Sequence, residues 1–144
     1  MKNSTLNQIL TDYLNGYSEI VFALLFGSQV TGKTRFNSDI DIAIYFKDEP
    51  DILMMGQIIA QLESLTNQRI DLVILNALPF KNPLLAYNIT GNHELLVCRD
   101  VQQYETFKFR SYCEYFDFEP ILKAQNDKLI EELQDGNFGK TKTA

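Results

Sequence analysis

The stretch LLFGSQVTGKTRFNSDIDIAIYF, residues Leu24 to Phe46, sets two carboxylates into the start of an otherwise apolar run. These are Asp39 and Asp41. Because alternate residues of a strand point to the same face, the two side chains lie together, with their Cα atoms roughly 6–7 Å apart. At an effective dielectric constant of ~20, two such charges repel by about 3 kcal/mol. A divalent cation between them removes this cost, so the pair predicts a metal site.

A glycine and a serine follow the preceding apolar run. Gly27 comes directly after Glu19–Phe26, which is expected to be a strand covered on both faces, and Ser28 comes next. A glycine lets the backbone approach a ligand closely, and a helix that begins at Ser28 turns free N–H groups towards an anion. Mg²⁺ is usually held by carboxylates together with substrate phosphates. The turn and the carboxylates together predict one bound nucleoside triphosphate.

A third carboxylate, Asp71, lies inside the run RIDLVIL, where an apolar residue would be less costly. Each feature alone has an ordinary explanation. The aspartate pair is typical of a solvated strand face, Gly27-Ser28 of a plain turn, and Asp71 of a strand-end charge or a partner of Arg69. The combination is more specific than its parts: Gly-Ser after an apolar strand, ten residues, Asp-x-Asp opening the next strand, and a carboxylate inside a third.

This combination resembles the DNA polymerase beta-like nucleotidyltransferase superfamily, through the pattern G-S-x(10)-D-x-D from Gly27 to Asp41. The short chain is similar to the minimal nucleotidyltransferases, in particular the MntA-type antitoxins that are paired with a HEPN-domain ribonuclease toxin. The resemblance implies Mg-dependent transfer of AMP from ATP to a hydroxyl, a tyrosine hydroxyl of the cognate toxin, which silences that toxin. The expected partners are therefore the HEPN toxin and ATP.

The resemblance also implies roles for individual residues. Asp39, Asp41 and Asp71 are expected to be catalytic and to hold two Mg²⁺ ions, with Asp71 also taking the proton of the acceptor as general base. Gly27 and Ser28 are expected to bind the β- and γ-phosphates of ATP.

One position departs from the family pattern. Many members carry an arginine just before the glycine of the connecting loop, whereas this chain has Thr31 before Gly32. Lys33 or Arg35 is the expected replacement as a nucleotide-binding cation.

The rest of the chain predicts an α/β (α+β) fold, with a mixed β-sheet of about four strands flanked by helices and a C-terminal helical segment. Two consecutive strands joined by a loop suit an antiparallel pair, and a later helix allows a parallel crossover. Pro120 should kink or split the last helix, because it lacks an N–H donor. Expected helices cover 6–17, 52–66, 83–88 and the chain from 101 onward, expected strands cover 19–26, 39–46, 69–75 and 93–100, and a loop is expected at 76–83.

Length and composition fit one minimal nucleotidyltransferase domain, residues 1–135, followed by a flexible tail, residues 136–144. A chain of 144 residues buries enough surface to fold without a disulfide or a metal. The net charge of −6 argues against a nucleic-acid partner, because such proteins usually present a basic face. No apolar run approaches the ~18 residues of a membrane span, so we expect no membrane partner and a cytoplasmic location, in which Cys98 and Cys113 are free thiols.

Two other functions remain open at this point. The chain could neutralise a toxin by binding alone, with a vestigial nucleotide site, although the presence of all the expected site residues weighs against this. It could also modify a small molecule such as an aminoglycoside, although such enzymes usually carry a further helical domain for the acceptor.

Two further features have both an ordinary and a functional interpretation. His93 is more simply a surface or turn histidine than a catalytic base. The aromatic segment Tyr104–Phe118 suits helix burial, and the alternatives are nucleobase stacking or a protein–protein surface, where aromatic residues are enriched.

Overall fold

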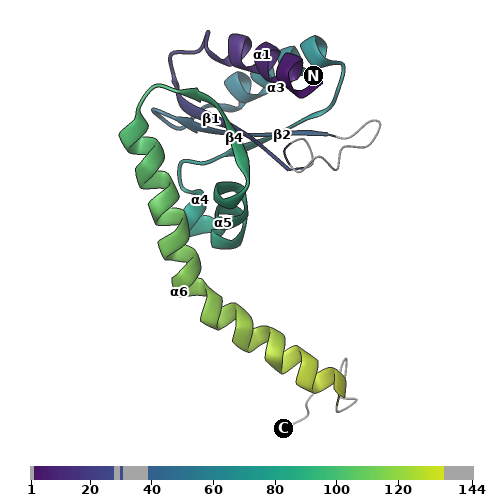
Figure 1. The fold of residues 1–144 in the computed structure, drawn as a ribbon, viewed down its shortest axis with the longest axis vertical. Helices are drawn as coiled ribbons and strands as arrows, with labels where there is room; N and C mark the ends of the chain where they lie inside the picture. The colour runs from purple at the N-terminus through teal and green to yellow at the C-terminus, as the bar shows by residue number, and fades with distance from the viewer. Residues whose placement is uncertain (1, 28–29, 31–38, 135–144) are drawn as a thin grey trace.

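The computed structural model describes residues 2–27, 30 and 39–134. A four-stranded sheet forms the centre of the molecule, and helices cover both of its faces (Figure 1). The elements in chain order are α1 Lys2–Leu14, β1 Ile20–Phe26, β2 Ile40–Phe46, α3 Ile52–Thr66, β3 Ile70–Ile74, α4 Leu78–Lys81, α5 Pro83–Gly91, β4 His93–Cys98 and α6 Val101–Gln134.

The sheet is mixed, as the sequence predicts. Its strand order is β3-β2-β1-β4, with β1 antiparallel to both β2 and β4, and with β2 parallel to β3. The consecutive strands β1 and β2 pair directly, whereas β2 and β3 are joined through the crossover helix α3. The predicted fold class, with its mixed sheet, flanking helices and C-terminal helix, is therefore confirmed.

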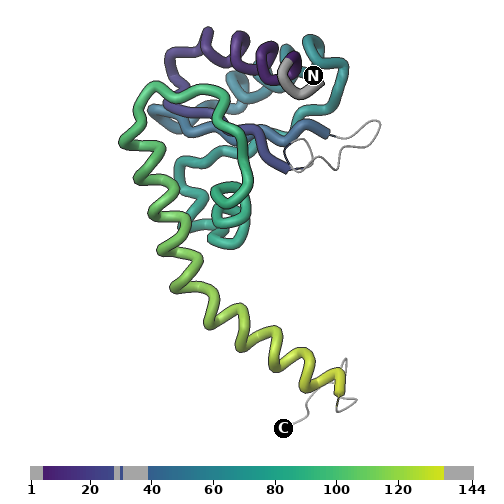
Figure 2. Tube along the Cα trace, in the orientation of Figure 1, coloured from purple at the N-terminus to yellow at the C-terminus, as the bar shows by residue number. Residues whose placement is uncertain are grey.

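Each face of the sheet belongs to a different apolar core. Alternate residues of β2, namely Ile40, Ile42 and Ile44, pack with α1 and α3, while Ala43 and Tyr45 face the core shared with α4, α5 and α6. Figure 2 shows the two layers of helix on opposite sides of the sheet. β1 contributes to both cores, which explains why its sequence, IVFALLF, is apolar throughout.

The short helix α4 corrects one prediction. Residues 76–83 read as a loop because of their two prolines and two asparagines, yet Leu78–Lys81 form a helical turn. Pro79 lies in its first turn, where the missing N–H has no intrahelical partner to lose. Asn82 then accepts a hydrogen bond from the Leu85 N–H and caps the start of α5.

Helix α6 continues through Pro120 as one element of 34 residues, so the helix is not split there. Its axis bends about midway, and its second half projects away from the sheet (Figure 1). The exposed position of Pro120 explains why the helix tolerates it, because water can reach the carbonyl that the proline leaves without a donor.

The aromatic segment at the start of α6 divides between core and surface. Phe107 is buried and Tyr104 is half-buried in the core with α4 and α5, as helix burial predicts. In contrast, Phe109, Tyr112 and Phe116 are exposed, so the packing interpretation accounts for only part of this segment.

The described residues do not test the predictions about the C-terminal tail and the domain boundary. The predicted tail, 136–144, lies outside the described residues, and the domain boundary at residue 135 stays a prediction. Within the part of the chain that the structure describes, no helix is long and apolar enough to cross a membrane.

Replacing Gly56 with alanine should stabilise the protein. Gly56 lies in the middle of α3, and a Cβ atom there meets nothing within 4 Å. Alanine favours a helix interior over glycine by about 1 kcal/mol, which corresponds to a rise of about 3 °C in Tm for a domain of this size. Thermal unfolding followed by circular dichroism measures the change. An unchanged or lower Tm would contradict the expectation.

Candidate active site

The strand register brings four residues into one row across the sheet. Asp71 on β3 is opposite Asp41 on β2, Asp41 is opposite Phe26 on β1, and Phe26 is opposite His93 on β4. Directly paired residues point to the same face of a sheet, so these side chains share the face covered by α4, α5 and α6. Asp39 immediately precedes β2 and is exposed. The sheet thus brings together carboxylates that lie about thirty residues apart in sequence.

Gly27 is fitted to the carboxylate of Asp41. Its φ angle is +77°, in the left-handed region that favours glycine, so the chain turns sharply as it leaves β1. A Cβ atom at this position would overlap the carboxylate oxygen of Asp41 and would lie 3.0 Å from its Cγ atom. The Gly27 carbonyl accepts a hydrogen bond from the Val30 N–H at 3.1 Å, which closes the turn. This glycine is needed for both its backbone conformation and its lack of a side chain.

The carboxylates interact electrostatically. The pKa of Asp41 is raised above its ordinary value, first by burial and then by the negative charges of Asp71 and Asp39. Protonation of Asp41 removes its charge and so relieves this repulsion. A bound cation would relieve it by neutralising the negative charges. Hard oxygen ligands of this kind suit Mg²⁺, which uses one or two carboxylates and completes its shell with water and phosphates. The donor set therefore fits a divalent cation held jointly with a nucleotide.

The side chains do not form a closed metal cage. Within residues 2–27, 30 and 39–134, no group of three or more histidine, cysteine or acidic side chains is arranged to hold a metal ion. Such an open arrangement leaves coordination positions for substrate oxygens. The other predicted binding residues, Ser28, Lys33 and Arg35, lie outside the described residues, so their roles stay predictions.

His93 and Tyr104 form a hydrogen-bonded pair at the end of the carboxylate row. The Nδ1 atom of His93 lies 2.9 Å from the Ile89 carbonyl oxygen and 3.0 Å from that of Thr90, so it carries the proton and donates. The Nε2 atom therefore accepts from the Tyr104 hydroxyl at 2.7 Å. Burial is the main cause of the raised pKa of Tyr104.

The interpretation of His93 as a simple surface or turn residue does not account for these hydrogen bonds. The side chain is half-buried at the first position of β4, and it ties α6 to α5 through Tyr104. Sequence reasoning missed the pair because the two residues lie on different elements. The available signal was the position of His93 at a strand start, directly after the helix stop Gly91-Asn92.

Comparison with known proteins identifies the family. The model of the polymerase beta nucleotidyltransferase family matches residues 8–102, which include the whole sheet, Gly27 and the three aspartates. The chain belongs to this family. The resemblance drawn from the Gly-Ser and Asp-x-Asp pattern is thus confirmed, and with it the enzyme class, nucleotidyltransferase.

Two curated relatives carry the name of a protein-modifying enzyme. The chain is 37% identical over 54 residues to a protein adenylyltransferase MntA of Thermococcus cleftensis, which is 38% of this chain and 54% of the relative. It is 35% identical over 54 residues to a putative protein adenylyltransferase of Methanocaldococcus jannaschii, or 38% of this chain and 63% of the relative. The matches thus span little more than half the length of these relatives.

Solved structures share the fold over nearly the full chain. A chain of a toxin–antitoxin complex with AMP-PNP matches with a TM-score of 0.70 and 23% identity, covering 90% of this chain and 99% of that one. A chain from a complex of tri-AMPylated Shewanella oneidensis HEPN toxin with MNT antitoxin matches with a TM-score of 0.66 and 20% identity, covering 86% and 98%. At these identities the likeness establishes the fold.

Replacing Asp41 with asparagine should stabilise the metal-free protein at neutral pH. Because the folded-state pKa of Asp41 is raised, the folded protein holds this proton more tightly than the unfolded chain. Its contribution to stability is therefore present at acid pH and is lost as pH rises through the folded-state pKa. We expect the variant to gain up to about 1 kcal/mol at pH 7, the scale of a partly exposed charge pair.

Thermal unfolding with EDTA, from pH 3 to pH 8, measures this difference. The gain should shrink as pH falls through the raised folded-state pKa of Asp41 and should be lost by about pH 3, where the wild-type carboxyl is protonated in both states. Asp48→Asn is the control, because Asp48 is exposed beyond the other end of β2. A variant that is less stable than wild type at pH 7, or a gain that persists unchanged at pH 3, would contradict the electrostatic explanation.

Proposed function

We propose that this chain transfers AMP from ATP to a tyrosine hydroxyl of a HEPN-domain toxin and thereby acts as its antitoxin. The observation that carries the proposal is the pairing of Asp41 with Asp71 on neighbouring strands, with Gly27 directly against the Asp41 carboxylate. The names of the two curated relatives, both protein adenylyltransferases, support the choice of a protein acceptor. The structural neighbours, which come from toxin–antitoxin complexes with AMP-PNP or with an AMPylated HEPN toxin, support the partner.

The proposed chemistry assigns a task to each residue. Asp39 and Asp41, together with Asp71, would hold two Mg²⁺ ions, which when bound neutralise the triphosphate and the acceptor oxygen. Gly27 and Ser28 would bind the β- and γ-phosphates through the backbone and the serine hydroxyl, and the absence of a side chain at Gly27 leaves room for the Asp41 carboxylate beside them.

Asp71 is the proposed general base. It is exposed at the edge strand β3, so an acceptor hydroxyl can reach it. Once Asp71 takes the hydroxyl proton, the acceptor oxygen attacks the α-phosphorus in line. The bond from the α-phosphorus to the bridging oxygen breaks, pyrophosphate leaves with that electron pair, and AMP stays on the acceptor. Positioning and charge neutralisation supply most of the rate enhancement.

The cation for the triphosphate is proposed to be Lys33 or Arg35. A cytoplasmic location accompanies the proposal, since the reaction needs ATP, and both cysteines are free, as expected in a reducing compartment.

Intact mass spectrometry tests the proposal directly. A HEPN-domain protein, sought first in the gene adjacent to the one for this chain, is incubated with this chain, ATP and Mg²⁺, and the mass of that protein is followed with time. A gain of one or more AMP units that is absent with Asp41→Asn supports the proposal. Tight binding and loss of ribonuclease activity without any mass gain would replace it with neutralisation by binding alone.

A further inference from the structure

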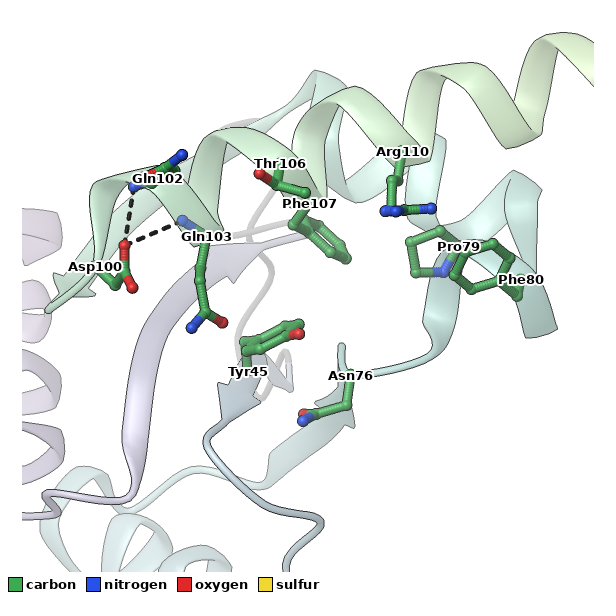
Figure 3. A pocket seen from close by; sticks show the side chains of 10 residues that line it. All are labelled: Tyr45, Asn76, Pro79, Phe80, Asp100, Gln102, Gln103, Thr106, Phe107 and Arg110. Atoms are coloured by element: carbon green, nitrogen blue, oxygen red, sulfur yellow. Dashed lines mark hydrogen bonds between the residues drawn. The ribbon is translucent and has the colours of Figure 1, made fainter.

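A cavity lies on the same side of the sheet as Asp41 and Asp71 but at the other end of β2. Its volume is about 330 Å³, and it opens between the end of β2, the helix α4 and the first three turns of α6 (Figure 3). This volume is at the lower end of the range for small-molecule sites, roughly 300–1,000 Å³. None of the residues given a role above in nucleotide transfer lines it.

Packed core separates this cavity from the candidate active site. Tyr45, which lines the cavity, is four residues from Asp41 on β2, or about 13 Å along the strand. Ala43 lies between them on the same face and is fully buried. A ligand in this cavity therefore cannot also contact the carboxylates, and the cavity is a separate site.

Aromatic rings form its walls. The rings of Tyr45 and Phe107 meet edge to face with their centroids 6.4 Å apart, and Phe107 is almost completely buried, so this wall is held in place by the core. Phe80 on α4 is 55% exposed and lines the other side of the cavity together with Pro79 (Figure 3). A cavity lined by aromatic rings that the core holds in place suits a flat ring as ligand, because ring stacking contributes about 1–3 kcal/mol per base in nucleic-acid sites.

Side-chain amides line the space beside these rings. The Asn76 amide is fixed, because its Oδ1 accepts from the Phe46 N–H at 3.0 Å and its Nδ2 donates to the Phe46 carbonyl at 2.7 Å. One N–H and one lone pair of this amide remain for a ligand. The Gln103 side chain points into the same space (Figure 3). Asparagine and glutamine amides match the N6 and N7 edge of adenine, which offers one donor and one acceptor.

A cation lies at the edge of the cavity. The Arg110 guanidinium is 5.7 Å from the centre of the Phe80 ring, which holds it over the opening, and it has no carboxylate partner within the described part of the chain. The carboxylate of Asp100 also lines the cavity, but its Oδ1 is engaged by the N–H groups of Gln102 and Gln103 at the start of α6. A single arginine suits one phosphate group, which it binds with two parallel hydrogen bonds.

We propose that this cavity is a second nucleotide site that binds adenosine monophosphate. The adenine packs against the wall formed by Tyr45 and Phe107, the Asn76 and Gln103 amides contact its edge, and the phosphate binds Arg110. The volume and the single cation favour a monophosphate over ATP. The site goes beyond the proposed transfer reaction and does not depend on it.

Isothermal titration of the full chain with AMP in EDTA tests this site, because the catalytic carboxylates then lack their cation. We expect a dissociation constant of about 1 mM or below. Arg110→Gln should weaken binding by roughly 10-fold or more, since it removes a charged hydrogen-bond partner. Lys123→Gln, which removes the same charge from the same helix outside the cavity, should bind as wild type.

The outcomes separate the two sites. Binding that Arg110→Gln leaves unchanged belongs to another site, the catalytic site included, and overturns the proposal, as does the absence of binding to the wild type. If Arg110→Gln also lowers the Tm, its loss of affinity does not distinguish a lost contact from a damaged fold. Gln103→Ala then tests the site, because the Gln103 side chain is exposed and its loss should leave the fold intact. A loss of affinity in Gln103→Ala supports the site, and unchanged affinity overturns it.

Discussion

Replacing Asp41 with asparagine is expected to reduce AMP transfer on the order of 10³-fold while leaving the fold intact. Asp41 is paired with Asp71 on the neighbouring strand, and its carboxylate lies directly against Gly27. An amide of the same shape keeps the packing but removes the negative charge with which Asp41 is proposed to hold the cation, and that cation would offset the negative charge that develops in the reaction. Loss of one preorganised electrostatic group typically costs 10²–10³-fold in kcat.

The measurement is the initial rate of AMP incorporation into the partner protein at saturating ATP and Mg²⁺. Asp48→Asn is the matched control, because it removes the same charge from the exposed turn after β2 and should transfer AMP as wild type. The two effects of Asp41→Asn on stability and on activity should have opposite signs. A variant that keeps more than about a tenth of the wild-type rate would show that the Asp41 charge is not essential for the reaction.

The orientation of β2 was predictable because its residues follow a two-residue period. Ile40, Ile42 and Ile44 could only be buried together, which fixes Asp41 on the other face. The helix at α3 allows a parallel crossover, and in the structure the register places Asp71 beside Asp41. The alternation of residues in β2 and the observed strand pairing therefore agree that Asp41 and Asp71 lie together on one face of the sheet.

The parts that escaped prediction depend on contacts between distant segments. Four residues of α4 are too short for any period, and their prolines resemble loop residues. The pairing of His93 with Tyr104 needs the relative placement of β4 and α6, which no local pattern encodes. The same holds for the cavity around Arg110, since its residues come from three elements that meet only in the folded chain.

Replacing Gly27 with alanine is expected to reduce AMP transfer by about 10²-fold and to destabilise the protein by about 1–3 kcal/mol. The left-handed backbone conformation alone costs a residue with a side chain about 1–2 kcal/mol. The added Cβ also overlaps the carboxylate of Asp41, so that side chain must leave its position. Displacement of a reacting group by about 1 Å can cost 10²-fold in rate.

The matched control for this change is Gly56→Ala, which makes the same substitution in the middle of α3 and should gain stability without any change in rate. Tm and the initial rate of AMP transfer are measured for both variants. A Gly27→Ala protein with wild-type Tm and rate would show that the turn can relax without moving Asp41.

A double-mutant cycle separates backbone strain from the overlap with Asp41. Asp41→Gly removes the carboxylate that a Cβ at residue 27 would meet. If the overlap contributes, Gly27→Ala should cost less stability in the Asp41→Gly background than in the wild type, with a coupling of about 0.5–3 kcal/mol. If the cost is the same in both backgrounds, it comes from the left-handed φ angle alone. The loss of transfer in Gly27→Ala would then have to arise from the turn at Gly27, which is proposed to bind the phosphates, because the Asp41 carboxylate would not have been displaced.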